Sequence, residues 1–189
     1  MLKNSERNII IGVSGASGSV YAKILFEKLA SLTDQYKSVS VIFSTNAIDI
    51  WKHEIKDTEY RNFPFIFFEN HDFHAGPASG SAGYDAMIIC PCSMGTMGRI
   101  AGGFSDSLIT RVADVMLKER KKLILVPRET PYNLIHIENM RLLTLAGAII
   151  CPANPSFYSL PGDINEVVAT VVDRVLDLSG FSISTFRWK

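Results

Sequence analysis

The chain has 189 residues, of which 47% are hydrophobic and 20% are charged, and its nineteen basic side chains balance nineteen acidic ones. This balance leaves no overall field that would attract nucleic acid or an anionic membrane surface. No apolar run reaches the roughly 20 residues that a membrane span needs, and the polar start of the chain is unlike a signal peptide. We therefore expect a single domain over residues 1–189, located in the cytoplasm.

The predicted elements alternate between strands and helices from the N-terminus onward. The apolar patterns predict strands at 8–13, 39–43, 86–90, 123–126 and 148–151, and helices at 20–32, 47–55, 106–118, 132–146 and 164–178. Residues 57–83 have no regular pattern, and we expect them to be irregular. Strands that alternate with helices predict an α/β fold in three layers (α/β/α), in which a doubly wound, mainly parallel sheet lies between two layers of helices.

A glycine-rich turn follows the first strand, at 12–18. Its glycines permit a sharp reversal, and the N-terminus of the next helix presents N–H groups to an anion. The turn lacks the Gly-x-Gly-x-x-Gly spacing of dinucleotide-binding proteins, and the second strand ends in Ser44-Thr-Asn46 without an acid for a ribose diol. These features argue against NAD and favour a mononucleotide phosphate; a tight turn without a ligand is the alternative.

The stretch 85–129 contains a strand, a polar loop, a helix and a second strand, which we expect to form the wall of a binding site. Its first strand is expected to end before Pro91 and to lead into a turn rich in hydroxyl groups and glycine, at 92–96. Its second strand is expected to end before Pro127, which places Arg128 at the carboxyl edge of the sheet, where α/β proteins bind ligands. Glu129 is expected to orient the Arg128 guanidinium group.

The helix predicted at 106–118 carries a stripe of charged side chains. Arg111 and Lys118 are seven residues apart, so they share one side of the helix at a separation of about 10.5 Å along its axis. They are suited to bind an anion together. The alternative is a solvated helix face on which Asp114 pairs with Lys118 at the ordinary i,i+4 spacing.

The cysteines and histidines do not predict a metal or redox centre. Cys90 and Cys92 lack the spacing of a redox or zinc pair, and together with Cys151 they are expected to be free thiols, mostly buried, in a reducing compartment. His71 and His74 lie in a loop without a third ligand nearby in the sequence, so we expect no metal site.

Several short motifs occur along the chain in one order. They are Ser14-Gly-Ala-Ser-Gly18, Pro77-Ala-Ser-Gly-Ser81, Cys90-Pro-Cys-Ser93, Arg111-Val-Ala-Asp-Val-Met-Leu-Lys-Glu-Arg120, Leu125-Val-Pro-Arg-Glu-Thr-Pro131, His136-x-Glu-Asn-Met140, Phe157-Tyr158 and Arg187-Trp188. This order closely resembles the UbiX-type flavin prenyltransferases, formerly described as 3-octaprenyl-4-hydroxybenzoate carboxy-lyases, which have the Rossmann-like fold of the flavin-dependent Cys decarboxylases. The resemblance covers nearly the whole chain.

The resemblance implies a reaction and its participants. A dimethylallyl group passes from dimethylallyl monophosphate to N5 and C6 of reduced FMN without a metal, and the prenylated FMN serves UbiD-type decarboxylases in ubiquinone biosynthesis or in the decarboxylation of aromatic acids. It also implies a homo-oligomer, a dodecamer in the family, whose pocket is shared between subunits.

The resemblance also implies the residues of the site. The FMN-binding residues would be Gly15, Ala16, Ser17, Ser44, Ser93, Met94, Gly95, Thr96 and Arg128. The residues that bind the substrate phosphate would be Arg111, Lys118, Tyr158 and Arg174. Lys118 would also be catalytic, and we hypothesise that Ser17 and Glu54 relay the N5 proton.

Two residues depart from the family pattern, and other functions stay open. Thr45 stands where the pattern has lysine, which removes a cation near FMN, and Phe73 stands where some members have tryptophan, which makes the prenyl pocket wall smaller. The nearest alternative is a flavin-dependent decarboxylase acting on a C-terminal cysteine or on pantothenoylcysteine, but such enzymes need a histidine near the flavin. A flavin-binding subunit without catalysis and direct decarboxylation of an aromatic acid are further alternatives.

Overall fold

The computed structural model describes residues 7–187; residues 1–6, Trp188 and Lys189, including the polar start of the chain and half of the Arg187-Trp188 motif, lie outside the described part. One sheet of six parallel strands has the order β3-β2-β1-β4-β5-β6. The strands are β1 (Asn8–Val13), β2 (Ser38–Phe43), β3 (Ile66–Glu69), β4 (Ala86–Cys92), β5 (Lys122–Pro127) and β6 (Ile149–Ile150). This is the strand order of a doubly wound nucleotide-binding sheet.

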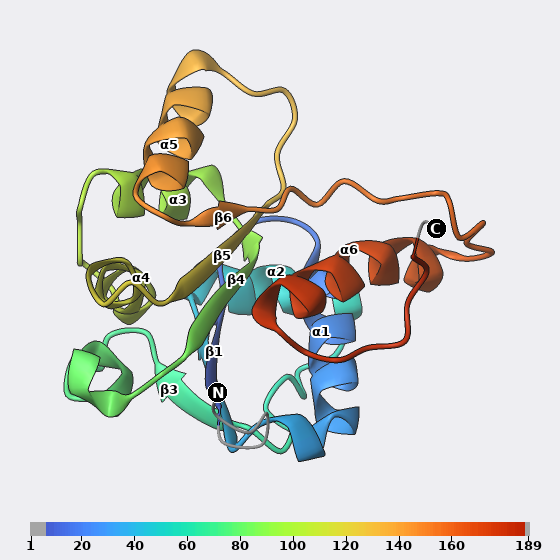
Figure 1. Ribbon diagram of the computed structural model, residues 1–189, viewed down its shortest axis with the longest axis horizontal. Helices are drawn as coiled ribbons and strands as arrows, with labels where there is room; N and C mark the ends of the chain where they lie inside the picture. Colours follow the sequence, from blue (N-terminus) through green and yellow to red (C-terminus); the bar gives the residue numbers. More distant parts are fainter. Residues whose placement is uncertain (1–6, 188–189) are drawn as a thin grey trace.

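Helices cover both faces of the sheet, which confirms the predicted three-layer α/β fold (Figure 1). They are α1 (Ser19–Ser31), α2 (Thr45–Ile55), α3 (Met94–Ala101), α4 (Leu108–Lys118), α5 (Leu134–Leu145) and α6 (Ile164–Ser179), with short 3₁₀ helices at Thr33–Gln35, Gly76–Ala78 and Gly80–Ala82. Helices α1, α2 and α6 pack on one face, and α3, α4 and α5 belong to the other.

The central strands are buried on both sides because they are almost continuously apolar. Alternate side chains of β1 separate into two cores: Ile9 and Ile11 pack under α1 and α6, whereas Ile10 packs under α3 and α4. Each fully buried isoleucine contributes roughly 1.5–3 kcal/mol of hydrophobic stabilisation. The pattern of a strand buried on both faces is the one that a parallel sheet requires.

Helix α4 has one apolar and one charged side, as its sequence predicts. Its apolar side chains, Leu108, Ile109, Val112, Val115 and Met116, are buried. On its charged side Arg111 Nη1 lies 3.3 Å from Asp114 Oδ2, and Lys118 Nζ lies 3.9 Å from Glu119 Oε1. Asp114 therefore pairs with Arg111, and not with Lys118 as the alternative had it.

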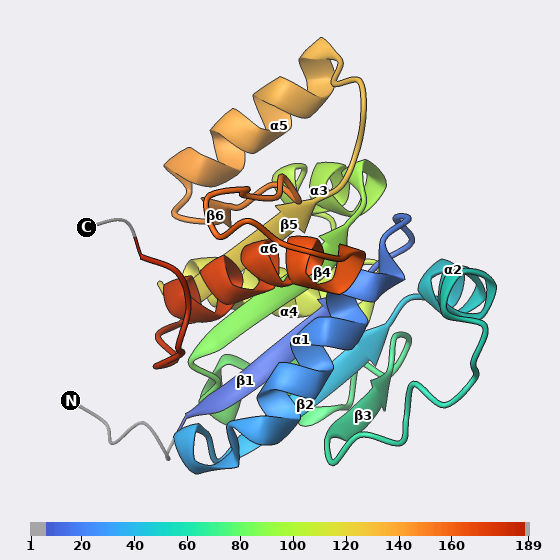
Figure 2. The same ribbon diagram turned by 90° about the vertical axis from the view of Figure 1, so that its right-hand side faces the viewer.

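Helix α5 stands away from the sheet and contacts it mainly through α3 and β6 (Figure 2). Its only buried side chain is that of Leu143. Large apolar side chains on this helix are exposed, namely Leu134, Ile135, Ile137, Leu142 and Leu145. An apolar helix surface of this extent is characteristic of contacts between proteins.

Five predictions about local structure were wrong. Strand β5 does not end before Pro127 but includes it. Residues 57–83 contain β3, a short edge strand whose burial does not alternate, and two 3₁₀ helices. Strand β4 continues through Pro91 to Cys92, with an irregular register where the proline lacks an N–H. The expected turn at 92–96 consists of the cap Ser93 and the first turn of α3. Strand β6 is shorter than 148–151, because only Ile149–Ile150 pairs with β5.

Candidate functional site

The loops after β1, β2 and β4 meet at the carboxyl edge of the sheet, where the strand order reverses between β1 and β4. Ser14 connects two of these loops, because its Oγ donates to the carbonyl oxygen of Pro91 at 3.0 Å and accepts from the N–H of Ser93 at 2.7 Å. Such a reversal point is the usual ligand-binding position in an open α/β sheet.

A cavity of about 360 Å³ lies at this edge. Its lining residues are Gly15, Ser44, Thr45, Asn46, Asn70, Ser93, Gly95, Thr96, Arg99, Asp106, Ser107, Ile109 and Thr110. Most of them come from the N-terminal ends of α2, α3 and α4, where backbone N–H groups without helical partners favour an anion. The cavity therefore suits a phosphate, and its lining contains five of the residues predicted to bind FMN.

The three serines of this cavity, Ser44, Ser93 and Ser107, are the N-caps of α2, α3 and α4. Ser44 Oγ accepts from the N–H of Ala47 at 3.2 Å, and Ser93 Oγ accepts from the N–H of Thr96 at 3.2 Å and donates to Thr96 Oγ1 at 3.0 Å. Each serine caps its own helix in the normal manner. The same side chains thus fix the helix ends that point into the cavity.

Gly15 is required by a close approach between two loops. A Cβ atom at this position would lie 2.7 Å from the Cβ of Asn46, which is far inside van der Waals contact. At Gly95 an added Cβ would only reach Arg99 Nη1 at 3.5 Å. The first glycine therefore sets the shape of the cavity, while the second leaves room beside it.

Arg99 is a cation in this cavity that is not among the residues predicted from the sequence. Its Nε donates to Asp106 Oδ2 at 3.1 Å, and its Nη1 donates to the carbonyl oxygen of Gly95 at 3.2 Å. The missed signal was its position on the helix that begins directly after β4. It lines the same cavity as Thr45, where the family pattern has lysine.

Glu54, Ser17 and Arg128 meet at the start of α1. Glu54 Oε2 accepts from the N–H groups of Gly18 at 2.9 Å and Ser19 at 2.7 Å, and Arg128 Nε donates to the carbonyl oxygen of Ser17 at 2.9 Å. Partial burial raises the pKa of Glu54, but hydrogen bonds from the Ser17 side chain and from the backbone outweigh burial and leave that pKa below its usual value. Glu54 is thus a carboxylate at neutral pH.

Three further predictions about this site can be compared with the structure: the positions of Ala16 and Met94, and the contact between Glu129 and Arg128. The side chains of Ala16 and Met94 are buried, so only their backbone atoms can face the cavity edge. Glu129 Oε1 accepts from the N–H of Thr130 at 3.0 Å. The expected orientation of Arg128 by Glu129 is wrong, because the carbonyl oxygen of Ser17 takes that role.

A second cavity, of about 640 Å³, contains Tyr158 and Arg174. Its lining residues are Cys151, Pro152, Asn154, Ser156, Tyr158, Thr170, Val171, Asp173, Arg174, Asp177, Thr185, Phe186 and Arg187. Arg174 Nη1 donates to Asp177 Oδ2 at 2.8 Å. The ring of Tyr158 stacks on Phe186 at 6.5 Å between centroids and 14° between planes.

The predicted phosphate-binding residues do not all meet within one subunit. Tyr158 and Arg174 share the cavity beside α6, whereas Arg111 and Lys118 lie on α4, which packs on the opposite face of the sheet (Figure 1). The side chain of Arg111 also donates from Nε to the carbonyl oxygen of Ala78 at 3.1 Å. One copy of the chain therefore presents the four residues as two separate pairs.

The cysteines are free and mostly buried, as predicted. Burial raises the pKa of the Cys90 thiol and raises that of Cys92 to about 12, so both are protonated at neutral pH. Cys151 is only partly buried. Among residues 7–187, no group of three or more potential metal ligands is close enough to hold an ion, and no helix is long and apolar enough to cross a membrane.

The family to which this architecture belongs is shown by comparison with known proteins. A model of the flavoprotein family matches residues 2–178, so the chain belongs to that family. "Flavin prenyltransferase UbiX" of Methanocaldococcus jannaschii is 45% identical over 184 residues, covering 95% of this chain and 97% of that protein. Its counterpart from Thermoplasma acidophilum is 44% identical over 174 residues, covering 91% and 94%. The chain is therefore an enzyme of the UbiX flavin prenyltransferase family.

Solved structures agree with this assignment. A dodecameric FMN-dependent UbiX-like decarboxylase from Escherichia coli O157:H7 has a TM-score of 0.90 at 35% identity, over 96% of this chain and 99% of that one. AnUbiX (PadA1), solved in complex with FMN and dimethylallyl pyrophosphate, has a TM-score of 0.87 at 35% identity, over 97% and 100%. These similarities confirm both the predicted family and the predicted fold.

Proposed function

We propose that this enzyme transfers a dimethylallyl group from dimethylallyl monophosphate to N5 and C6 of reduced FMN. The observation that most directly supports this reaction is the pair of cavities suited to phosphate, one at the helix N-termini of the sheet edge and one beside α6. A protein that only stores flavin needs one of them. A transferase that binds two phosphorylated molecules, FMN and the allylic monophosphate, and releases phosphate from the second, needs both.

The first cavity suits FMN. The close approach of Gly15 to Asn46 brings the turn after β1 to the edge of this cavity, and Ser44 and Ser93 cap the ends of α2 and α3 that border it. We assign FMN binding to Gly15, Ala16, Ser17, Ser44, Ser93, Met94, Gly95, Thr96 and Arg128. When bound, reduced FMN supplies the nucleophilic N5 and C6 atoms.

The second cavity suits the leaving phosphate. Charge accumulates on the phosphate oxygens as the allylic bond breaks, and guanidinium and hydroxyl donors stabilise that charge. We assign this role to Tyr158 and Arg174 of one subunit. Because Arg111 and Lys118 lie on the other face of the sheet, we propose that a second copy of the chain supplies them.

This arrangement requires an oligomer. The exposed apolar side chains of α5 provide a surface for association, and the E. coli neighbour is a dodecamer. We therefore propose a homo-dodecamer whose active sites lie between subunits.

Glu54 and Ser17 are proposed to move the proton of N5. Because its pKa is lowered, Glu54 is deprotonated at neutral pH and can accept a proton, with the Ser17 hydroxyl between the carboxylate and the reacting atom. Glu54 also holds the N–H groups of Gly18 and Ser19, so it fixes the turn that carries Ser17. One side chain thus combines positioning with proton transfer.

The product is proposed to serve a UbiD-type decarboxylase, as the family resemblance implies, and the enzyme is proposed to act in the cytoplasm. The three free thiols support a reducing compartment. The decarboxylase alternative is less well supported, since none of the four histidines lines the cavity at the sheet edge.

One experiment tests the proposed reaction. The protein is incubated anaerobically with reduced FMN and dimethylallyl monophosphate, and the flavin is analysed by mass spectrometry. We expect the mass of one added dimethylallyl group, and no added mass with oxidised FMN. Unmodified flavin together with CO₂ release from a peptide ending in cysteine would support the decarboxylase instead.

A further inference from the structure

Residues 181–187, called the tail below, follow α6 and reach the second cavity. Helix α6 ends at Gly180, whose positive φ of 92° allows the chain to reverse, and the N–H of Phe181 then donates to the carbonyl oxygen of Leu176 at 3.0 Å. The reversed chain brings residues 185–187 back alongside the helix. The tail therefore forms part of the cavity wall.

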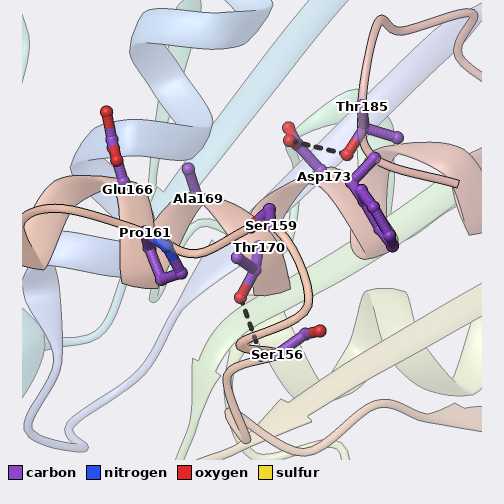
Figure 3. A pocket seen from close by; sticks show the side chains of 9 residues that line it. Ser156, Ser159, Pro161, Glu166, Ala169, Thr170, Asp173 and Thr185 are labelled. Carbon is purple, nitrogen blue, oxygen red and sulfur yellow. Dashed lines mark hydrogen bonds between the residues drawn. The ribbon is translucent and has the colours of Figure 1, made fainter.

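Three successive tail residues contact this wall. Thr185 Oγ1 donates to Asp173 Oδ2 at 3.1 Å, as Figure 3 shows together with the neighbouring bond from the Ser156 N–H to Thr170 Oγ1. Phe186 stacks on Tyr158. Arg187 Nη2 donates to Asp177 Oδ1 at 2.9 Å.

Asp177 holds two arginines at once. Its Oδ2 accepts from Arg174 and its Oδ1 from Arg187, at 2.8 and 2.9 Å. Both arginine side chains remain about 60% exposed, at 61% and 59%, whereas that of Asp177 is 24% exposed. Each guanidinium group keeps further N–H donors that the carboxylate does not use. Asp177 thus holds the guanidinium groups of Arg174 and Arg187 next to each other, and both groups have N–H donors left for another acceptor.

The charges of the cavity show which cation is in excess. Its charged lining residues are Asp173, Arg174, Asp177 and Arg187. Asp173 is compensated by Lys28 of α1, whose Nζ lies 2.6 Å from Asp173 Oδ1, and Asp177 compensates Arg174. Without Arg187 these pairs would leave a neutral wall facing a phosphate of charge about −1.5 to −2. Arg187 makes the wall cationic.

We infer that Arg187 is a further substrate-binding residue, which binds the phosphate of the allylic substrate together with Arg174. This inference rests on the proposed function, since that function supplies the phosphate. Asp177 acts as a positioning residue for both guanidinium groups, and a planar fork held in place loses little freedom when it binds an anion. The tail is therefore part of the binding site and not only its cover.

The test compares Arg187→Gln, Arg187→Lys and Thr185→Val with the wild type. Arg187→Gln is expected to raise the KM for dimethylallyl monophosphate and the inhibition constant of inorganic phosphate by the same factor, roughly ten-fold or more. Arg187→Lys should recover most of both. Thr185→Val loosens the tail without removing charge, so its inhibition constant for phosphate should stay near the wild-type value. Arg61→Gln, at an exposed pair with Glu69 of β3, is the matched control.

Two outcomes would overturn the inference. Unchanged phosphate inhibition in Arg187→Gln would show that Arg187 does not contact the anion. Equal defects in Thr185→Val and Arg187→Gln, without rescue by lysine, would show that the tail acts only as a mechanical tether. Direct calorimetric titration of wild type and Arg187→Gln with inorganic phosphate needs no turnover. It therefore separates a failure of this inference from a failure of the proposed reaction.

Discussion

Replacing Glu54 with glutamine should weaken the turn that precedes α1. Glu54 Oε2 accepts two backbone N–H groups, from Gly18 at 2.9 Å and Ser19 at 2.7 Å. Glutamine keeps one acceptor oxygen but loses the negative charge at the positive end of the helix. Hydrogen bonds to a charged acceptor contribute about 1.5–3 kcal/mol, and solvent screening of this partly exposed group reduces the net loss to about 1 kcal/mol.

The effect should depend on pH in a defined direction. The pKa of Glu54 is lowered in the folded protein, so its stabilising contribution is present above the ordinary glutamate value of about 4.3 and is lost as the pH falls through the lower folded value. Urea unfolding at pH 7 should give free energies of unfolding for wild type and Glu54→Gln that differ by about 1 kcal/mol. The difference should shrink below about pH 4, with the m-value unchanged.

The same variant tests the proposed proton transfer. Glutamine cannot accept the N5 proton, so prenyl transfer should slow by roughly 10²-fold or more while FMN still binds. If Glu54→Gln has wild-type stability at pH 7, or if the stability difference persists unchanged to pH 3, then the Glu54 carboxylate does not stabilise the start of α1. Normal prenyl transfer across the pH range would refute the catalytic role independently.

Three further substitutions test the site, and a fourth, Gly95→Ala, is a control. Gly15→Ala places a Cβ 2.7 Å from that of Asn46. This variant should lose FMN affinity, measured by calorimetry, and its fold should be destabilised by about 1–3 kcal/mol. Gly95→Ala should fold normally. Arg99→Gln should weaken FMN binding about ten-fold and reduce its salt dependence, and equal affinity at low and high salt in the wild type would contradict this. Lys118→Ala should spare FMN binding and slow prenyl transfer, and unchanged turnover would exclude Lys118 from the phosphate site.

The sequence predicted those parts of the fold whose signal is local. Strand β1 was found at its observed ends, Asn8–Val13, because a continuous apolar run between polar residues has one simple interpretation. Strand β3 was missed because it lies at the edge of the sheet and its burial does not alternate. Helix α3 was taken for a turn because Gly95 and Gly98 lower its helix propensity, whereas capping by Ser93 and the packing of Met97 stabilise it.

Some site residues could not be found from local patterns. Arg99 was missed as a consequence of the missed helix, although its spacing of four residues from Gly95 fits one helical turn. The ion pair of Arg187 with Asp177 joins residues ten positions apart, and it depends on the chain reversal at Gly180. A reversal of that kind depends on tertiary packing, here of Phe181 into the core under α6.

The placement of the predicted phosphate residues on two faces of one sheet limits how the enzyme can work. A sheet of buried apolar strands separates α4 from α6, and side chains cannot cross it. If Arg111 and Lys118 act on the same phosphate as Tyr158 and Arg174, they must come from another copy of the chain. The apolar side chains left exposed on α5 then have a functional reason, because the association that buries them would also complete the active site. On this view oligomerisation is a condition of catalysis, whereas the cavity at the sheet edge, which one chain lines by itself, does not depend on it.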